Sequence, residues 1–195
     1  MSNQVETVIQ VQLTNRDKKT VFWRGFLAVP VVAFLASFSQ GTDAAWASGL
    51  IVLPLVLALL VRGVYPSYLL SFNHSVMELN ARLSSYVLLL NDDYPSIERN
   101  PNVAILLPDI EGGKKLSRGL PLFKWFLAIP LVIVGLLYAA LALVYTFIAW
   151  IITWSTGNYP AWALDVVLGT IKFWNRLYGY AVILVTDEYP SFSLK

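Results

Sequence analysis

The sequence predicts an all-α membrane protein built from two parallel tandem repeats. Each repeat is expected to be a transmembrane helical hairpin followed by an amphipathic helix at the membrane interface, with a short cytoplasmic β-element. Three observations lead to this fold class. The 195 residues are 57% hydrophobic and only 13% charged. Long segments carry no charge, and the motifs of the first half recur in the second half in the same order.

The composition indicates that lipid is the main solvent of the chain. Soluble domains carry about 25% charged residues, and a domain this short leaves much of its surface in water. The net charge of +2 is weak and scattered, which argues against a nucleic-acid partner. The chain has no cysteine and one histidine, His74, so we expect no disulfide, no metal site and no cofactor.

The first hydrophobic block predicts a helical hairpin over about 21–62. Its two uncharged segments, 25–38 and 44–61, are separated by a polar turn that ends at Asp43. Each segment is close to the roughly 20 residues that cross a bilayer core. Lipid tolerates only helices or closed barrels, because backbone polar groups find no water there.

The second block runs from Trp125 to Trp154 without a charge. One straight helix of this length would be about 45 Å long, whereas the hydrocarbon core is about 30 Å thick. Two short helices joined by a tight turn near 136–141 would fit, and the repeat described next favours this second hairpin, over about 121–156. A single helix kinked at Pro130 is the alternative.

The two halves match motif by motif, and such repeats are read before any other fold feature. The matching segments are VFWRGFLAVP (21–30) with PLFKWFLAIP (121–130), GVYPSY (63–68) with GNYPAW (157–162), and ARLSSYVLLLNDDYPSI (81–97) with NRLYGYAVILVTDEYPSF (175–192). These matches predict repeats over 1–97 and 98–195. An even number of spans in each makes the repeats parallel, with an axis along the membrane normal.

Polar residues at helical spacing predict amphipathic helices over about 66–90 and 160–185. We expect the helices to lie at the interface, because a charge in mid-membrane costs about 2.5–3.5 kcal/mol and a spanning helix would place the basic linker outside. Spanning would instead give six helices and inverted repeats. The polar stripes are candidate contacts to lipid head groups or a partner, and their charged residues are Glu78, Arg82, Asp165, Lys172 and Arg176. Glu78 and Lys172 occupy equivalent positions, so we hypothesise that they pair across the axis.

The chain contains four Tyr-Pro pairs. Proline suits the first turn of a helix, so Pro66 and Pro160 are expected to start the amphipathic helices. Tyrosine is enriched at membrane interfaces, and the predicted interfacial anchors are Tyr65, Tyr94, Tyr159 and Tyr189.

The remaining elements fix the expected topology. The alternating segments 7–13 and 103–107 are expected to pair as a small cytoplasmic sheet. Interfacial amphipathic helices would bring all 14 Lys and Arg residues to the cytoplasmic side or its boundary. Both the N-terminus and the C-terminus are then cytoplasmic.

The second half, from WFLAIPLVIVGLLYAALALVYTFIAWIITWSTGNYP to NRLYGYAVILVTDEYPSF, resembles an uncharacterised bacterial membrane-protein family of the actinobacterial type. Members show an AIP hairpin, TGxYP, an amphipathic helix and a closing TDxYP. The resemblance covers almost the whole chain, although the first half departs from it with VRGVYP and NDDYP. It implies a bacterial plasma membrane and no particular activity.

No residues in the sequence form a recognisable catalytic pattern. His74 lies one helical turn before Glu78 on the polar stripe, and helical spacing places Ser71 in the same row without convergent geometry. The acidic pairs Asp92-Asp93 and Asp187-Glu188 are expected to cap or solvate turns.

These features favour a non-catalytic scaffold or accessory protein that organises partners or lipid at the cytoplasmic leaflet. The expected partners are membrane lipids, including anionic head groups, together with a second copy of the chain or a membrane complex. The alternatives are a subunit of a small-solute or lipid transporter or channel, and an interfacial lipid-modifying enzyme.

Overall fold

The computed structural model describes residues 3–38, 52, 54–98 and 100–194. In this part the chain is mostly helical, as predicted. The elements follow in the order β1 (Glu6–Ile9), α1 (Lys18–Phe38), a π-helical turn (Ala58–Arg62), α3 (Ser67–Val87), β2 (Val103–Leu106), short 3-10 turns (Glu111–Gly113 and Leu120–Leu122), α4 (Lys124–Thr156) and α5 (Ala161–Ala181). Two of these helices, α1 and α4, are long and apolar enough to cross a membrane.

Helix α1 begins at an acidic cap. The Asp17 carboxylate accepts hydrogen bonds from the Lys19 N–H at 3.0 Å and the Thr20 hydroxyl at 2.7 Å, which satisfies donors that a helix N-terminus leaves free. This helix is the first arm of the predicted hairpin. The predicted turn at Asp43 lies outside the described residues, as does half of the second arm, 44–61.

The second predicted hairpin is wrong, because α4 is one continuous helix of 33 residues that passes through Pro130. No polar turn interrupts the segment, so a hairpin near 136–141 would leave carbonyls without partners in an apolar surrounding. Small residues recur every seventh position on its buried side, at Ala128, Gly135, Ala142 and Ala149. A Cβ atom on Gly135 would lie 2.9 Å from the Phe173 ring of α5, so this seam lets the two helices approach closely.

The Gly-x-Tyr-Pro segments make the turns into α3 and α5. Gly63 and Gly157 end the preceding helices at φ of 61° and 79°, which favours residues without a Cβ. Pro66 and Pro160 are extended and lead directly into α3 and α5. The predicted starts of both helices are therefore confirmed.

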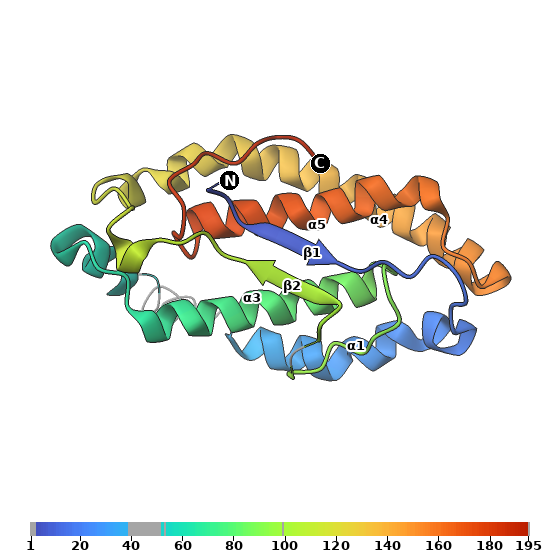
Figure 1. The fold of residues 1–195 in the computed structure, drawn as a ribbon. Helices are drawn as coiled ribbons and strands as arrows, with labels where there is room; N and C mark the ends of the chain where they lie inside the picture. The colour runs from blue at the N-terminus through green and yellow to red at the C-terminus, as the bar shows by residue number, and fades with distance from the viewer. Residues whose placement is uncertain (1–2, 39–51, 53, 99, 195) are drawn as a thin grey trace.

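The two predicted strands pair with each other, which confirms the expected β-element. They are antiparallel, with Thr7 opposite Ile105 and Ile9 opposite Val103. The sheet lies on α3 and α5, with β2 against α3 and β1 against α5 (Figure 1). His74 of α3 contacts the Ile105 carbonyl at 2.7 Å, and the Asn175 amide of α5 donates to the Thr7 hydroxyl at 3.0 Å.

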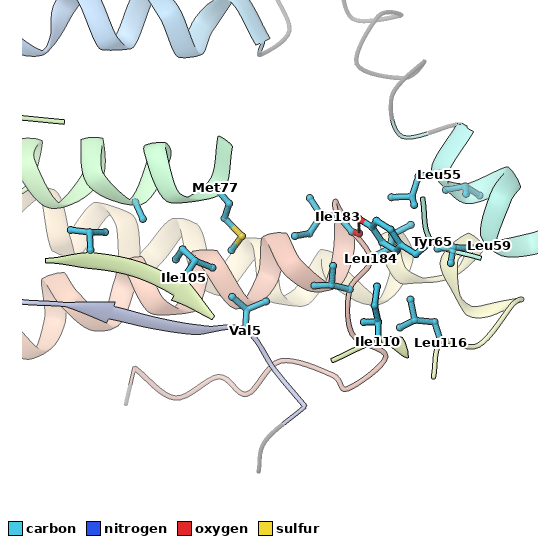
Figure 2. Packing of buried hydrophobic residues seen from close by; sticks show 14 residues of the cluster. Val5, Leu55, Leu59, Tyr65, Met77, Ile105, Ile110, Leu116, Ile183 and Leu184 are labelled. Atoms are coloured by element: carbon cyan, nitrogen blue, oxygen red, sulfur yellow. Dashed lines mark hydrogen bonds between the residues drawn. The ribbon is translucent and has the colours of Figure 1, made fainter. Parts of the chain in front are cut away.

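The helices form layers behind this sheet. Helix α3 lies between α1 and the sheet, and the largest buried cluster fills the space between α3, the strands and the segment after α5 (Figure 2). Met77 of α3, Ile105 of β2 and Ile183 and Leu184 after α5 meet there. Helix α4 packs along α5 and passes behind it, and it also contacts α1 (Figure 1). The order of layers is thus sheet, then α3 with α5, then α1 with α4.

Candidate functional site: two buried ion-pair clusters and an apolar helix surface

Asp92 lies at the centre of a cluster that joins the start of α1 to the chain after α3. Its Oδ1 accepts from Arg16 at 2.6 Å and from Arg24 at 2.8 Å, and its Oδ2 accepts from the Asp17 N–H at 3.0 Å. The Arg24 guanidinium also lies 4.9 Å from the centre of the Tyr86 ring. Tyr94 packs edge-on against that ring at 6.1 Å. We call this group the first cluster.

A second cluster joins the start of α4 to the chain after α5. Lys124 Nζ lies 2.8 Å from Asp187 Oδ1, donates to the Thr186 carbonyl at 2.6 Å and lies 5.1 Å from the centre of the Tyr180 ring. Asp187 Oδ2 accepts from the Ser117 N–H at 2.5 Å. Tyr189 packs edge-on against Tyr180 at 5.7 Å.

Apart from Arg16, the contacts of the two clusters correspond. Each contains a cation from the fourth position of a matched ten-residue segment, the first carboxylate of an acidic pair, a backbone N–H seven residues before the cation and two tyrosines. They differ in charge, because the place of Arg16 is taken by Leu116 in the second half. The first cluster therefore holds two cations against one carboxylate.

The prediction that Asp92 and Asp187 only cap or solvate turns is wrong. Burial raises the pKa of each carboxyl, but hydrogen bonds and charge from Arg16 and Arg24 at Asp92, and from Lys124 at Asp187, outweigh it and hold each pKa below its usual value. A signal was present in the sequence, since a basic residue and an acidic residue recur at matched positions. The two residues of each pair are more than sixty positions apart in the sequence, so a local pattern could not predict their contact.

The predicted polar stripe divides into buried and accessible residues. Arg82 is buried and donates to the Ser96 carbonyl at 3.1 Å and to that of Glu98, while Arg176 donates to the Ser193 carbonyl. Both arginines thus hold the segment that follows their own helix, and Arg82 is too enclosed to serve as a surface contact. Asp165 is exposed on α5.

The hypothesised pair of Glu78 and Lys172 is not among the ion pairs of the described residues. Glu78 lies 3.5 Å from His74 one turn earlier on the same helix. The neighbour of Glu78 is therefore His74 on its own helix, and not Lys172 across the axis.

Two of the four predicted interfacial anchors, Tyr65 and Tyr159, are buried within the protein and are only 3% and 4% exposed. Burial raises the pKa of each to about 12. The Tyr65 N–H donates to the Gly112 carbonyl at 2.8 Å, and the Tyr159 N–H donates to the Leu13 carbonyl at 2.7 Å. These tyrosines therefore join each half of the chain to the segment that precedes the apolar helix of the other half. Tyr94 and Tyr189 are exposed.

The largest feature of the surface is apolar. Only 22% of the most apolar stretch of α1 or α4 is buried, whereas a core helix of a soluble protein is mostly buried. The buried residues form one narrow stripe, at Arg24, Ala28 and Val31 in α1 and at the matched Lys124, Ala128 and Leu131 in α4. The remaining faces form what we call the outer surface, which includes Trp23, Phe26, Val29, Trp125, Phe126, Ile133, Leu137, Val144, Phe147, Ile151 and Trp154.

Basic residues flank the outer surface at both ends of the helices. At one end Lys18 donates to the Ser155 carbonyl at 2.6 Å, beside exposed Lys19. At the other end Arg118 reaches the turn at Gly63, next to exposed Arg62 and Lys114. Cations near the last carbonyls of a helix are favoured by its dipole.

A cavity of about 380 Å³ opens between α3, α4 and α5. Its lining is mainly apolar, from residues that include Leu143, Ile171 and Trp174, and its polar side chains are Asn80, Ser84, Thr170, Asn175 and the Tyr178 phenol. In the described part of the chain, no three His, Cys, Asp or Glu side chains gather as a metal site would require.

No protein-family model, no curated protein and no solved structure matches this chain.

Proposed function

We propose that the protein is a non-catalytic integral membrane module of the bacterial plasma membrane, with both termini cytoplasmic, which organises lipid and partner proteins at the cytoplasmic leaflet. The observation that carries this proposal is the outer surface. Monomeric soluble proteins rarely expose contiguous apolar patches larger than a few hundred Å². Apolar side chains surround α4 on every side except where it packs against α5 and α1, which is the pattern of a helix in lipid.

We further propose that the chain consists of two tandem repeats, 1–97 and 98–195, that are related by an axis through the sheet. The matching clusters, the matching buried stripes of α1 and α4 and the antiparallel pairing of β1 with β2 support this arrangement. The family resemblance of the second half is consistent with it and also favours a bacterial membrane.

The proposal of a non-catalytic role rests on how the reactive groups are used. The Asp92 and Asp187 carboxylates are neutralised by cations, and His74 is held against a backbone carbonyl. A catalytic acid or base must reach a substrate proton, whereas these groups join secondary-structure elements of the chain itself.

The test is to express the tagged chain in bacteria and ask where it is found and what it holds. We expect the chain to stay with membranes after an alkaline carbonate wash and to retain phospholipid in native mass spectrometry of detergent-purified material. A double variant, Phe126→Lys with Ile133→Lys, should lose both properties, while Asp165→Lys on the exposed side of α5 should keep them. Recovery of the unsubstituted chain in the aqueous fraction would contradict the proposal.

The cavity favours lipid transfer as a second candidate function, because its mainly apolar lining suits an acyl chain. Fluorescently labelled phosphatidylglycerol in donor vesicles is a direct probe. Transfer to acceptor vesicles that falls with Ser84→Phe, but not with Ser71→Phe on the exposed part of α3, would support this function. Equal transfer with and without the protein would exclude it.

A further inference from the structure

We infer that the protein embeds in a single leaflet, with α1 and α4 lying in the plane of the membrane inside the hydrocarbon of the cytoplasmic leaflet and the sheet in water. This inference rests on the proposed membrane function and deepens it. It replaces the transmembrane hairpins of the sequence prediction with a flat arrangement that the layers of the fold favour. The partner of the outer surface is one leaflet with anionic head groups.

The position of the sheet carries the argument. Helix α5 returns alongside α4, with Tyr138 of α4 against Phe173 at 5.3 Å and Tyr145 against Trp162 at 5.2 Å. The sheet in turn lies on α5 near Asn175, close to the level of Phe173. An upright α4 would therefore bring the sheet to the depth of the hydrocarbon core. A two-stranded sheet has open edges, and unpaired backbone groups are not tolerated in lipid.

The charged and polar residues of the sheet also favour a position in water. Glu6 of β1 is exposed, and the strand begins beside Gln4 and ends beside Gln10. Moving a charged carboxylate from water into hydrocarbon is very costly. In a flat arrangement the same residues face the cytoplasm, because the sheet lies on α3 and α5 whereas α4 passes behind α5 (Figure 1).

The basic ends give an independent argument. The start of α1 lies at the end of α4, as the contact of Lys18 with the Ser155 carbonyl and that of Phe22 with Trp154 at 5.5 Å show. The basic residues that precede α4 lie at the opposite end of that helix. Upright helices would place Lys19 on one side of the membrane and Lys114 on the other, against the excess of cytoplasmic Lys and Arg. Flat helices place both on the same side.

The dimensions also fit one leaflet. Helix α4 has 33 residues, and at 1.5 Å per residue it is about 50 Å long, too long for an upright span of the roughly 30 Å core. A helix with its side chains is about 10–12 Å across, which is less than the roughly 15 Å of hydrocarbon in half of that core. The layer of α1 and α4 therefore fits within one leaflet, and α3 and α5 reach the head groups.

Cations near that level can bind anionic lipid. Lys19, Arg62 and Lys114 are exposed and form no ion pair within the described residues. Lys115, in contrast, is already paired with Glu111 at 2.9 Å. An anionic membrane surface attracts nearby cations, so the flat arrangement gains from phosphatidylglycerol at both ends of the helices.

Spin labels on single cysteines test the arrangement, since the chain has no cysteine of its own. Labels are attached at Phe126→Cys, Leu137→Cys and Ile151→Cys, which lie along one face of α4. The protein is placed in vesicles of phosphatidylglycerol and phosphatidylcholine. The depth of the labels is measured from relaxation by oxygen and by a water-soluble nickel complex. We expect three similar depths. A profile in which Leu137→Cys lies about 15 Å deeper than the other two, half of the core thickness, would overturn the inference.

Labelling from one side provides the second measurement. An impermeant thiol reagent added outside oriented vesicles should react with Glu6→Cys, Lys19→Cys and Lys114→Cys together or with none of them, according to vesicle orientation. Reaction of Lys19→Cys and Lys114→Cys from opposite sides would also overturn it. If instead Leu137→Cys were as accessible to nickel as Glu6→Cys, the proposed membrane function itself would fail, so the two failures are distinguishable.

Discussion

Replacing Asp92 by asparagine tests how the first cluster stabilises the protein. In the described part of the chain, Asp92 is the carboxylate that contacts both Arg16 and Arg24, whose side chains are 0% and 5% exposed. The substitution leaves two enclosed guanidinium groups without a counter-charge. Breaking a buried pair by removing one partner costs about 3–5 kcal/mol, and we expect Asp92→Asn to reach the upper end because two cations lose their partner.

Two matched variants calibrate this effect. Asp187→Asn leaves one cation, Lys124, without a counter-charge, and the Lys124 side chain is 1% exposed. We therefore expect the lower end of the cost of breaking a buried pair, about 3 kcal/mol. Asp93→Asn is the control, because its carboxylate accepts from the amides of Asn100 and Asn102 and, among the described residues, from no cation. A neutral hydrogen-bond change there should cost about 1 kcal/mol.

The assay is equilibrium unfolding in detergent micelles, followed by tryptophan fluorescence as SDS is added. The free energy of unfolding should fall most for Asp92→Asn, less for Asp187→Asn and least for Asp93→Asn. If Asp92→Asn were no more destabilising than Asp93→Asn, the carboxylate would not be the group that neutralises the two arginines, and the reasoning from burial and charge would be refuted.

Three further predictions concern pH and packing. Because the folded pKa of Asp92 and of Asp187 is below the usual value, the stability from both clusters should be fully present above about pH 4, the unfolded pKa. It should be lost as the pH falls through the folded pKa. Acid titration of the resistance to SDS measures this loss, and the same titration profile in Asp187→Asn as in the unsubstituted protein would contradict the prediction. Gly135→Leu should separate α4 from α5 against the Phe173 ring and lower the midpoint of thermal unfolding, whereas Leu136→Ala on the outer surface should not. Gly157→Val should cost more than about 1 kcal/mol, because a β-branched residue is strained at positive φ, and equal stability of the two proteins would show that this turn relaxes.

The local patterns of the sequence predicted most of the helices. Apolar and polar periodicity marked α3 and α5, and the Tyr-Pro pairs marked where they begin. Their ends were predicted too late, because the left-handed backbone at Leu89 and Leu184 turns the chain away sooner. A leucine gives no signal of such a conformation, which glycine would have supplied.

Element length and tertiary contacts could not be predicted in the same way. The second hairpin was inferred from bilayer thickness, yet the seven-residue recurrence from Ala128 to Ala149 already indicated one uninterrupted helix seam. The clusters were missed because Arg24 and Asp92 are distant in the sequence, and only the fold brings them together. Tyr65 was predicted to lie at a surface from its residue type, whereas its buried hydroxyl donates to the Ile183 carbonyl at 2.7 Å.

The crossed hydrogen bonds of Tyr65 to Gly112 and of Tyr159 to Leu13 bear on how such a chain arises and folds. Each half completes the turn of the other, so an isolated half would expose both an unsatisfied amide and an unpaired strand. Two identical halves could satisfy these groups only by exchanging segments as a homodimer. If the proposed repeats arose from a gene for one half, its product would function only by self-association, and duplication and fusion would convert that assembly into a single chain whose halves are free to differ, as Arg16 and Leu116 do.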